Sequence, residues 1–494
     1  MKRYFSAIAT AAASLLLVSC FGLDEGNYKE LAPITFNEVS SVIDIPLGQE
    51  LVFDKLQVTS DKPVEYQWAY GPKKITASKD EYEMDSMEVI STDPQIRYTF
   101  KKLGQFVLRL RIDNGESIEY KYFTLNVNSG LDEGLCILNT DKDGNSALTF
   151  IKKRTEDEVA AGDQEIWPDV FKTINPDQAI TSATDVFMSY HDNKGVIYAQ
   201  ILISTNDDRG TIYKLEPKTF ELMAMNRMKE ETGACCMGFT GHNASGGTYN
   251  YTLMRGDNGH TYRYDLFGDF IGERFDATAA GLVTGQYTML YSTNNKYSST
   301  NLKSLLYNET TLFQPGNGKV TAVTLDGYKV INLASDRDAN KTYVLMQSAT
   351  DPTSYTIKYT TGSLGSYKAV KDFTAEKLNM DRNSIMVNAK NSADVYYNYD
   401  NKVWRWGLTA APSESPVSAI AVPAGETITA MATNFMADFP DGTDESLLYV
   451  ATYNESTGKG SVYVYDILTE TLAASYKDVC DGKPLKLMYK YRIS

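Results

Sequence analysis

Strand-like segments recur through residues 131–494 at a regular spacing, and this repeat limits the fold more than any other feature of the chain. Seven segments have the character of inner strands, and successive starts lie between 43 and 57 residues apart. Units of four short strands in about 40–50 residues, repeated up to eight times, are typical of a β-propeller. The sequence therefore predicts an all-β propeller here, with inner strands at 181–190, 234–240, 287–292, 330–335, 384–389, 428–435 and 485–492.

Three outer strands are expected after most inner strands. In the two clearest units they are residues 196–204, 211–215 and 220–225, and residues 394–399, 402–407 and 416–421.

The two ends of this region complement each other. Residues 134–138 and 147–151 are expected strands with no inner strand before them, and residues 485–489 have no outer strands after them. Pairing the two ends completes one blade and leaves no open edge. The sequence therefore predicts seven blades, closed by the N- and C-terminal strands. Six or eight blades stay open as alternatives because residues 299–325 are irregular.

Cys136 and Cys480 lie near these ends, but their positions argue against a disulfide bond between them. In an antiparallel pair, Cys136 is expected to face Tyr489 or Lys490. Cys480 is then about ten residues away, or roughly 33 Å along an extended strand. This separation exceeds the limit of about 7 Å for bridgeable Cα atoms.

Residues 33–128 predict a separate β-sandwich. Residues 105–112 alternate between apolar and polar, Asn114-Gly115 indicates a type I′ hairpin turn, and a second alternating run covers 118–127. Further strands are expected at 64–68 and 96–100. About 95 residues with a Trp on a middle strand and a closing hairpin favour an Ig-like sandwich.

The first twenty residues have the order of a secretory signal peptide. Lys2 and Arg3 are followed by an apolar stretch over 7–18 and then by small residues before Cys20. We therefore expect residues 1–19 to be removed. Residues 20–32 are short, polar and contain Gly, which is typical of a tether.

Composition excludes several classes of partner and of chemistry. The formal charge is −15, which argues against nucleic acid and anionic lipid headgroups as partners. None of the five cysteines has the spacing of a zinc site, there are only three histidines, and no Gly-x-Ser-x-Gly motif occurs. We therefore expect no metal, no cofactor and no catalytic residue.

Two motifs resemble those of known families. Leu17-Val18-Ser19-Cys20 resembles the lipobox of bacterial lipoproteins, which implies that Cys20 carries a lipid. An ordinary signal peptide that contains a Cys is the alternative. Residues 66–71, with the sequence YQWAYG, and residues 98–108 resemble the strand motifs of PKD-type Ig-like domains. The usual acidic residue after the Trp is replaced by Ala69, so this resemblance implies the fold and no ion site.

The whole chain resembles the PKD-like lipoproteins of Bacteroides-type bacteria. The order of lipobox, tether, PKD-like sandwich and propeller carries this resemblance, and Asp24-Glu25 is similar to the acidic export signal of their surface lipoproteins. The resemblance implies an outer-membrane protein that faces the cell exterior and accompanies an importer of the starch-utilisation type, a TonB-dependent channel with a lid lipoprotein.

Candidate ligand-binding residues lie on turns between the second and third strands of the predicted blades, and on one insert. Charged groups, amphipathic rings and hydrogen-bonding groups at one rim are what a polar small-ligand site needs. Solvated turns rich in Asp and Asn are the alternative. The rim residues are Asp207, Arg209, Arg255, Asp257, His260, Tyr399 and Asp400; Trp167 lies in the insert 154–180.

We therefore expect a non-catalytic protein that captures glycans or peptides for the importer or docks onto it. Two alternatives remain. One is a propeller-based glycan hydrolase or lyase with paired carboxylates on one rim. The other is a purely structural subunit of the importer.

Overall fold

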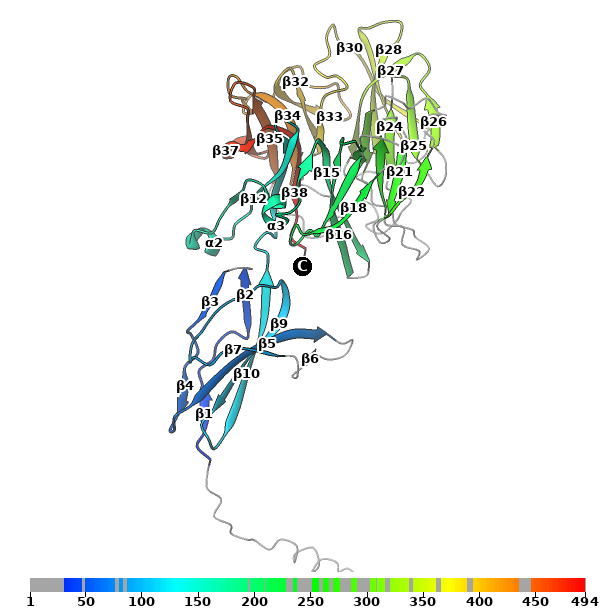
Figure 1. Cartoon of the computed structure of the whole chain (residues 1–494). Helices are drawn as coiled ribbons and strands as arrows, with labels where there is room; N and C mark the ends of the chain where they lie inside the picture. Colours follow the sequence, from blue (N-terminus) through cyan, green and yellow to red (C-terminus); the bar gives the residue numbers. More distant parts are fainter. Residues whose placement is uncertain are drawn as a thin grey trace, which may run out of the picture. The chain divides into compact units, whose positions relative to one another are not determined.

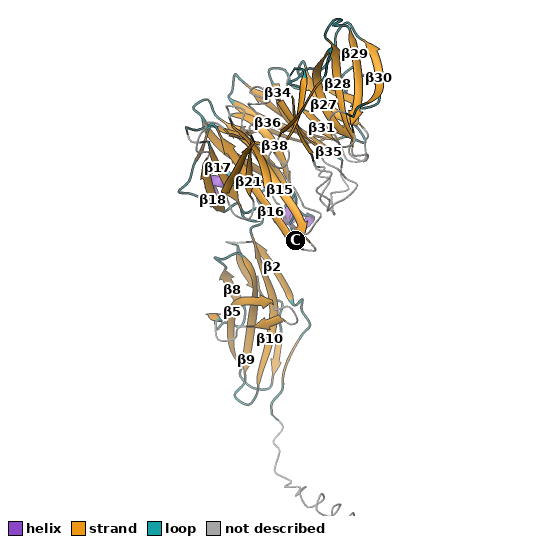
Figure 2. Ribbon diagram, turned by 90° about the vertical axis from the view of Figure 1, so that its right-hand side faces the viewer, coloured by secondary structure: helices purple, strands orange, loops and turns teal. Residues whose placement is uncertain are grey.

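The chain divides into two compact units, with the boundary between Gly130 and Leu131. Almost every described element of the computed structural model is a strand (Figures 1 and 2), which confirms the all-β prediction. The model describes residues 31–46, 49–75, 80–82, 87–193, 196–208, 210–227, 234–237, 251–256, 261–265, 270–275, 286–290, 303–307, 309–315, 320–336, 341–360, 366–388, 394–434 and 446–493.

Unit 1 is built on a sheet in the order β2-β10-β9-β5-β6, with β7 also paired to β5, and on two smaller strand pairs, β1–β4 and β3–β8. Its strands are β1 (Ile34–Phe36), β2 (Val42–Pro46), β3 (Glu50–Phe53), β4 (Val58–Ser60), β5 (Glu65–Ile75), β6 (Asp80–Tyr82), β7 (Glu88–Ser91), β8 (Ile96–Thr99), β9 (Gly104–Asp113) and β10 (Ile118–Asn128).

One face of the large sheet forms the core of unit 1. Trp68 and Phe123 from this sheet pack against Phe53 from β3, with ring centroids 5.1–6.2 Å apart. The indole Nε1 of Trp68 donates to the carbonyl of Asp93, so the one polar atom of this ring is satisfied. The expected strands at 64–68, 96–100, 105–112 and 118–127 are confirmed.

The turn between β9 and β10 differs from the prediction. Asp113 pairs with Ile118, so four residues rather than two connect the strands. The side-chain oxygen of Asn114 accepts hydrogen bonds from the backbone N–H groups of Glu116 and Ser117. This side chain closes the wider turn, whereas a type I′ turn would place Asn114 at its tip.

Unit 2 consists of seven sheets in the part of the chain that the structure describes. The first sheets along the chain are formed by β15 (Ala183–Asn193), β16 (Val196–Thr205), β17 (Thr211–Leu215) and β18 (Leu222–Arg227); by β19 (Ala234–Met237), β20 (Tyr251–Gly256), β21 (Thr261–Asp265) and β22 (Phe270–Phe275); and by β23 (Gln286–Leu290), β24 (Lys303–Tyr307), β25 (Thr311–Pro315) and β26 (Val320–Thr324).

The next sheets contain β27 (Tyr328–Asp336), β28 (Lys341–Ser348), β29 (Ser354–Thr360) and β30 (Lys368–Thr374); β31 (Met386–Asn388), β32 (Asp394–Tyr399) and β33 (Lys402–Gly407); and β34 (Thr427–Thr433), β35 (Leu447–Asn454), β36 (Lys459–Asp466) and β37 (Thr471–Asp481).

A composite sheet joins the two ends of unit 2. It contains β38 (Lys483–Lys490), β11 (Gly134–Thr140), β12 (Asn145–Lys152), β13 (Ile166–Trp167) and β14 (Ile180–Thr181), with two short helices, α2 (Glu156–Ala161) and α3 (Val170–Ile174), in its connections. Antiparallel pairing of β11 with β38 places Cys136 opposite Met488, one residue from the expected Tyr489. Cys136 and Cys480 are both buried free thiols.

Within the described residues the sheets contact one another in a cycle, and in six of the seven neighbouring pairs the contact is between one edge strand of each sheet. β38 contacts β15 and β34, β15 contacts β19, β19 contacts β23, β23 contacts β27, and β31 contacts β34. The sheets that start with β27 and β31 share a core that includes Leu345 and Tyr397. Radial repetition of four-stranded sheets is the arrangement of a propeller, so unit 2 is propeller-like.

One predicted outer strand is wrong, and a second is displaced by two residues. Residues 416–421 do not form a strand, because Pro412 and Pro416 lack the N–H that a ladder needs. This segment instead runs beside β33 through single bonds, Ser413 N to Arg405 O and Val417 N to Val403 O. β18 starts two residues late because Phe220 has a φ of 60°, which extended strands exclude.

Candidate functional site

The turn between the second and third strands of a sheet holds the start of the next sheet. At the composite sheet, the carbonyl of Gly144 accepts from Ser182 N at 2.8 Å, and Ser182 lies directly before β15. The carbonyl of Ser182 in turn accepts from Asn206 N, in the β16–β17 turn, at 2.6 Å. These bonds connect the turns of two neighbouring sheets.

The same device recurs elsewhere in the cycle. Asn401, in the β32–β33 turn, donates to Glu426 O and accepts from Ile428 N, both at 2.8 Å. Gly482, directly before β38, donates to Gly458 in the β35–β36 turn at 2.9 Å. Val330 N donates to Glu309 O in the β24–β25 turn at 2.8 Å. These second-to-third-strand turns therefore share one end of unit 2, which we call the turn end.

The chain enters unit 2 at the opposite end of the composite sheet. There Gly134 begins β11 opposite Lys490, the last residue of β38. Lys490 is buried, and its ammonium donates to the carbonyls of Leu131 at 2.6 Å and Asp132 at 2.5 Å. Burial lowers the pKa of Lys490 to about 8. The last strand of the unit thus fixes the first residues that follow unit 1.

The described rim residues have structural roles in their turns. The Asp207 carboxylate accepts from the backbone N–H of Thr211 at 3.0 Å and from its hydroxyl at 2.6 Å. Asp400 and Asn401 have φ values of 48° and 54°, which a type I′ hairpin turn requires. The carbonyl of Tyr399 accepts from the Trp404 indole at 2.9 Å, and Lys377 Nζ lies 5.7 Å from the centroid of the Tyr399 ring.

Several predicted residues lie outside the described part of the chain. These are Cys20, Arg209, Asp257 and His260. Arg255 pairs through its backbone with Cys235 and Thr261, and its side chain is not described.

The structure places the rim residues in two groups. Asp207 lies on the sheet that starts with β15, and Arg255 lies on the neighbouring sheet that starts with β19. Tyr399 and Asp400 lie on the sheet that starts with β31, whose core contacts are with the sheets that start with β27 and β34. Both groups therefore lie at the turn end of unit 2, but on sheets that are not neighbours.

Two tryptophans of unit 2 belong to its core, and the third packs against it. Trp404 and Trp406 share one face of β33, as expected, and both are buried, with indole Nε1 groups that donate to the carbonyls of Tyr399 and Ala410. Trp167 pairs with Phe150 across β12 and β13 and packs against the composite-sheet core. Its Nε1 is buried and has no hydrogen-bond partner in the part of the chain that the structure describes.

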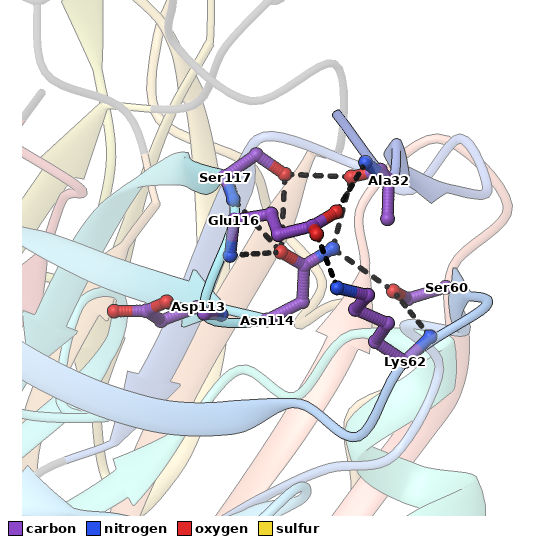
Figure 3. A network of polar contacts seen from close by, with 8 residues as sticks. Ala32, Ser60, Lys62, Asp113, Asn114, Glu116 and Ser117 are labelled. Carbon is purple, nitrogen blue, oxygen red and sulfur yellow. Dashed lines mark hydrogen bonds and ion pairs between the residues drawn. The ribbon is translucent and has the colours of Figure 1, made fainter. Parts of the chain in front are cut away.

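Sequence reasoning missed a polar cluster where the chain enters unit 1 (Figure 3). Asn114, buried in the β9–β10 turn, donates to the carbonyl of Ala32 at 2.9 Å and to the hydroxyl of Ser60 at 3.1 Å. Glu116 accepts from Ala32 N at 3.1 Å and pairs with Lys62, while the Ser117 hydroxyl donates to Ala32 O at 2.8 Å. Ala32 is the last residue of the expected tether, so this cluster is a clamp at the tether's end.

Changing Asn114 to Ala is expected to destabilise unit 1 by about 2–4 kcal/mol. The substitution removes several hydrogen bonds worth about 1 kcal/mol each and leaves buried groups without partners. Urea unfolding of residues 31–130, in which Trp68 is the one tryptophan, followed by fluorescence measures the loss. Asn37→Ala is the matched control, because that Asn makes exposed bonds to Lys55 and Gln57. An equal effect of both substitutions would contradict the clamp.

Among the described residues, no group of three or more His, Cys, Asp or Glu side chains is placed to hold a metal ion. The described helices include none that is long and apolar enough to cross a membrane.

Comparison with known proteins finds likenesses in structure alone. No protein family matches the sequence, and no curated protein resembles it. Among solved structures, a quinonprotein alcohol dehydrogenase-like protein from Bacteroides thetaiotaomicron aligns over 94% of this chain and 100% of its own, with 15% identity and a TM-score of 0.46. The β-propeller domain of Cps50 (Swd1) from Myceliophteria thermophila aligns over 60% and 86%, with 11% identity and a TM-score of 0.36.

Proposed function

We propose that the chain is a surface-exposed outer-membrane lipoprotein, attached through a lipid on Cys20 after removal of residues 1–19. It acts as a non-catalytic component of a TonB-dependent nutrient importer and captures a glycan or peptide or docks onto the channel. Unit 1 is a PKD-like, Ig-like spacer, and unit 2 is a seven-bladed propeller that presents the turn end.

The end at which the chain enters unit 2 supports this proposal. The chain from the proposed anchor enters unit 2 at the end of the composite sheet that carries Gly134 and Lys490, while the turns emerge at the other end. Within unit 2, the turn end therefore lies away from the residues that follow unit 1. Bonds between neighbouring sheets also hold the turns in place, and a preorganised rim loses little entropy when it binds a partner.

The seven sheets support seven blades, because the composite sheet supplies the last one from both ends of the unit. Trp68, on the middle strand β5 and packed on Phe53 and Phe123, supports an Ig-like fold for unit 1. The Asp207 carboxylate is engaged by Thr211. This engagement favours a structural role over the acid–base role that a glycan hydrolase would need.

Changing Cys20 to Ala is expected to release the protein from the outer membrane or to block its processing, because one side chain carries the whole attachment. Fractionation of cells followed by immunodetection measures the result. Cys480→Ala, a buried thiol of unit 2, is the control that keeps attachment. A Cys20→Ala protein that fractionates with the outer membrane as the wild type does would overturn the proposed anchor.

Affinity purification from the native organism tests the rest of the function. We expect a TonB-dependent channel to co-purify with the lipidated protein. The purified protein should also bind a glycan or peptide pool saturably, without forming products. Turnover would favour the hydrolase or lyase, and channel association without ligand binding would favour a structural subunit.

A further inference from the structure

The face of the large unit 1 sheet that points away from the core carries an unusual set of side chains. Leu108, Leu110 and Trp68 point into the core, so the alternate residues of the same strands point outward. Partners across an antiparallel ladder share a face, and here Arg111 pairs with Gln67 and Tyr120, while Arg109 pairs with Ala69 and Tyr122. We call Gln67, Arg109, Arg111, Tyr120 and Tyr122 the tyrosine face.

The two tyrosines leave aromatic surface at the solvent. Tyr120 is 42% exposed, and its ring lies nearly parallel to that of Tyr122, with centroids 6.3 Å apart and planes at 21°. Neither ring belongs to the core of unit 1. A tyrosine ring offers an apolar face and a polar hydroxyl edge, which is the combination used where a partner is half apolar and half hydrated.

The two arginines of this face differ in how their charges are compensated. Arg111 Nη2 pairs with Asp113 Oδ2 at 2.5 Å. The guanidinium of Arg109 lies 5.7 Å from the centroid of the Tyr120 ring, and within the described residues it has no carboxylate partner. Its Nε is buried, and no described residue accepts a hydrogen bond from it. Arg109 is therefore a cation held beside an exposed ring, with capacity for an anion.

The face is closed on one side and open on the other. Ala69 and Val107 also point outward but are 0% and 1% exposed. The open side begins at the tyrosines, towards the β9–β10 turn. An extended occupant would therefore lie along Tyr122 and Tyr120 and end against the buried side.

We propose that the tyrosine face binds a polysaccharide whose repeating unit carries a carboxylate, a uronic acid. The apolar C–H faces of successive sugar rings pack on Tyr120 and Tyr122, and the sugar carboxylate pairs with Arg109 through the two parallel hydrogen bonds that a guanidinium forms. Arg109 selects this class locally, although the whole chain carries a formal charge of −15, because among the described residues its guanidinium has no carboxylate partner. The site lies in unit 1 and does not depend on the turn end of unit 2.

The test measures binding of hexagalacturonate, and of the same hexamer with all its carboxylates methyl-esterified, to the mature protein by calorimetry. Esterification removes the charge and keeps the rings. We expect the acid form to bind about tenfold more tightly than the ester, or by roughly 1.4 kcal/mol. Arg109→Gln should reduce the acid form to the affinity of the ester, and Tyr120→Ala should weaken both forms.

Arg97→Gln is the matched control. Arg97 is an exposed arginine of the same unit, on β8, and it lies 3.6 Å from Glu50. Its substitution should leave both affinities unchanged. Thermal melts check that each variant is folded, which we expect because the substituted side chains lie outside the core.

Three results would overturn the proposal. They are no binding of the acid form at millimolar concentration, equal binding of the acid and ester forms, and unchanged affinity in folded Arg109→Gln and Tyr120→Ala proteins. Loss of a co-purifying protein in these variants without any glycan binding would instead make the face a protein-docking surface.

Discussion

Deleting residues 485–494 is expected to destabilise unit 2 so strongly that it melts well below the wild type and aggregates. These residues contain most of β38, which pairs with β11 and contacts the first strands of both neighbouring sheets. Without β38, the cycle of sheets opens and β11 presents an unpaired edge. An unpaired edge is a template for association with other chains.

The size of this effect follows from burial. Leu487, Tyr489 and Tyr491 are all buried at the joint between the composite sheet and the sheet that starts with β34. Burying a large apolar side chain contributes roughly 1.5–3 kcal/mol, while the total stability of a typical protein is about 5–15 kcal/mol. Loss of these side chains therefore removes a large part of the total, and loss of the Lys490 bonds adds to it.

Differential scanning calorimetry measures the result. Deletion of residues 22–31 is the control, because it removes ten residues of the expected tether and leaves the clamp at Ala32 in place. The control should melt as the wild type does. Equal melting temperatures for the two deletions would contradict closure of unit 2 through its C-terminal strand.

The repeat made the sheets of unit 2 predictable from the sequence. Strands are encoded locally, because short runs rich in apolar, β-branched and aromatic residues between turn residues are enough to mark them. Expected inner strands such as 330–335 and 428–435 coincide with β27 and β34. Even the irregular stretch 299–325 holds three regular strands, β24, β25 and β26. The spacing of the repeat therefore carried more information than the composition of any single segment.

Features that depend on partners far away in the sequence were harder to predict. The turn at Asn114 is set by Ala32 and Ser60, which no local pattern connects to it. Similarly, Asp207 is a predicted ligand-binding residue, but its carboxylate accepts hydrogen bonds from Thr211 within its own turn. The tyrosine face was not predicted, because Tyr120 and Tyr122 have the pattern of ordinary strand residues. Only the pairing of β9 with β10 places Arg109 beside them.

Changing Tyr397 to Phe is expected to stabilise unit 2 by about 1–3 kcal/mol at neutral pH. Tyr397 lies in the core with Trp404 and Trp406, and its buried hydroxyl has no hydrogen-bond partner among the described residues. A buried polar group without a partner costs about that amount. Tyr489 is the matched comparison, since its hydroxyl donates to Glu133 at 2.6 Å, and Tyr489→Phe should destabilise the unit.

High pH should reduce the stability that both tyrosines contribute to unit 2. Burial raises the pKa of Tyr397, and burial together with neighbouring tyrosines and Glu133 raises the pKa of Tyr489. The unfolded chain therefore loses each proton first, at its ordinary pKa of about 10. The contribution of each raised pKa to the free energy of unfolding is complete below pH 10. It is lost as the pH rises through the folded-state pKa, by about 1.4 kcal/mol per pH unit for each such tyrosine.

Urea unfolding at pH 7 and at several values between pH 10 and 12, followed by tryptophan fluorescence, separates the two contributions. Each Phe variant should lose stability less steeply with pH than the wild type, because one titrating group is gone. At pH 7 the two variants should move in opposite directions, with Tyr397→Phe above the wild type and Tyr489→Phe below it. Parallel losses at pH 7 would mean that the Tyr397 hydroxyl has a partner in solution, and an unchanged pH slope would mean that neither hydroxyl resists ionisation in the folded protein.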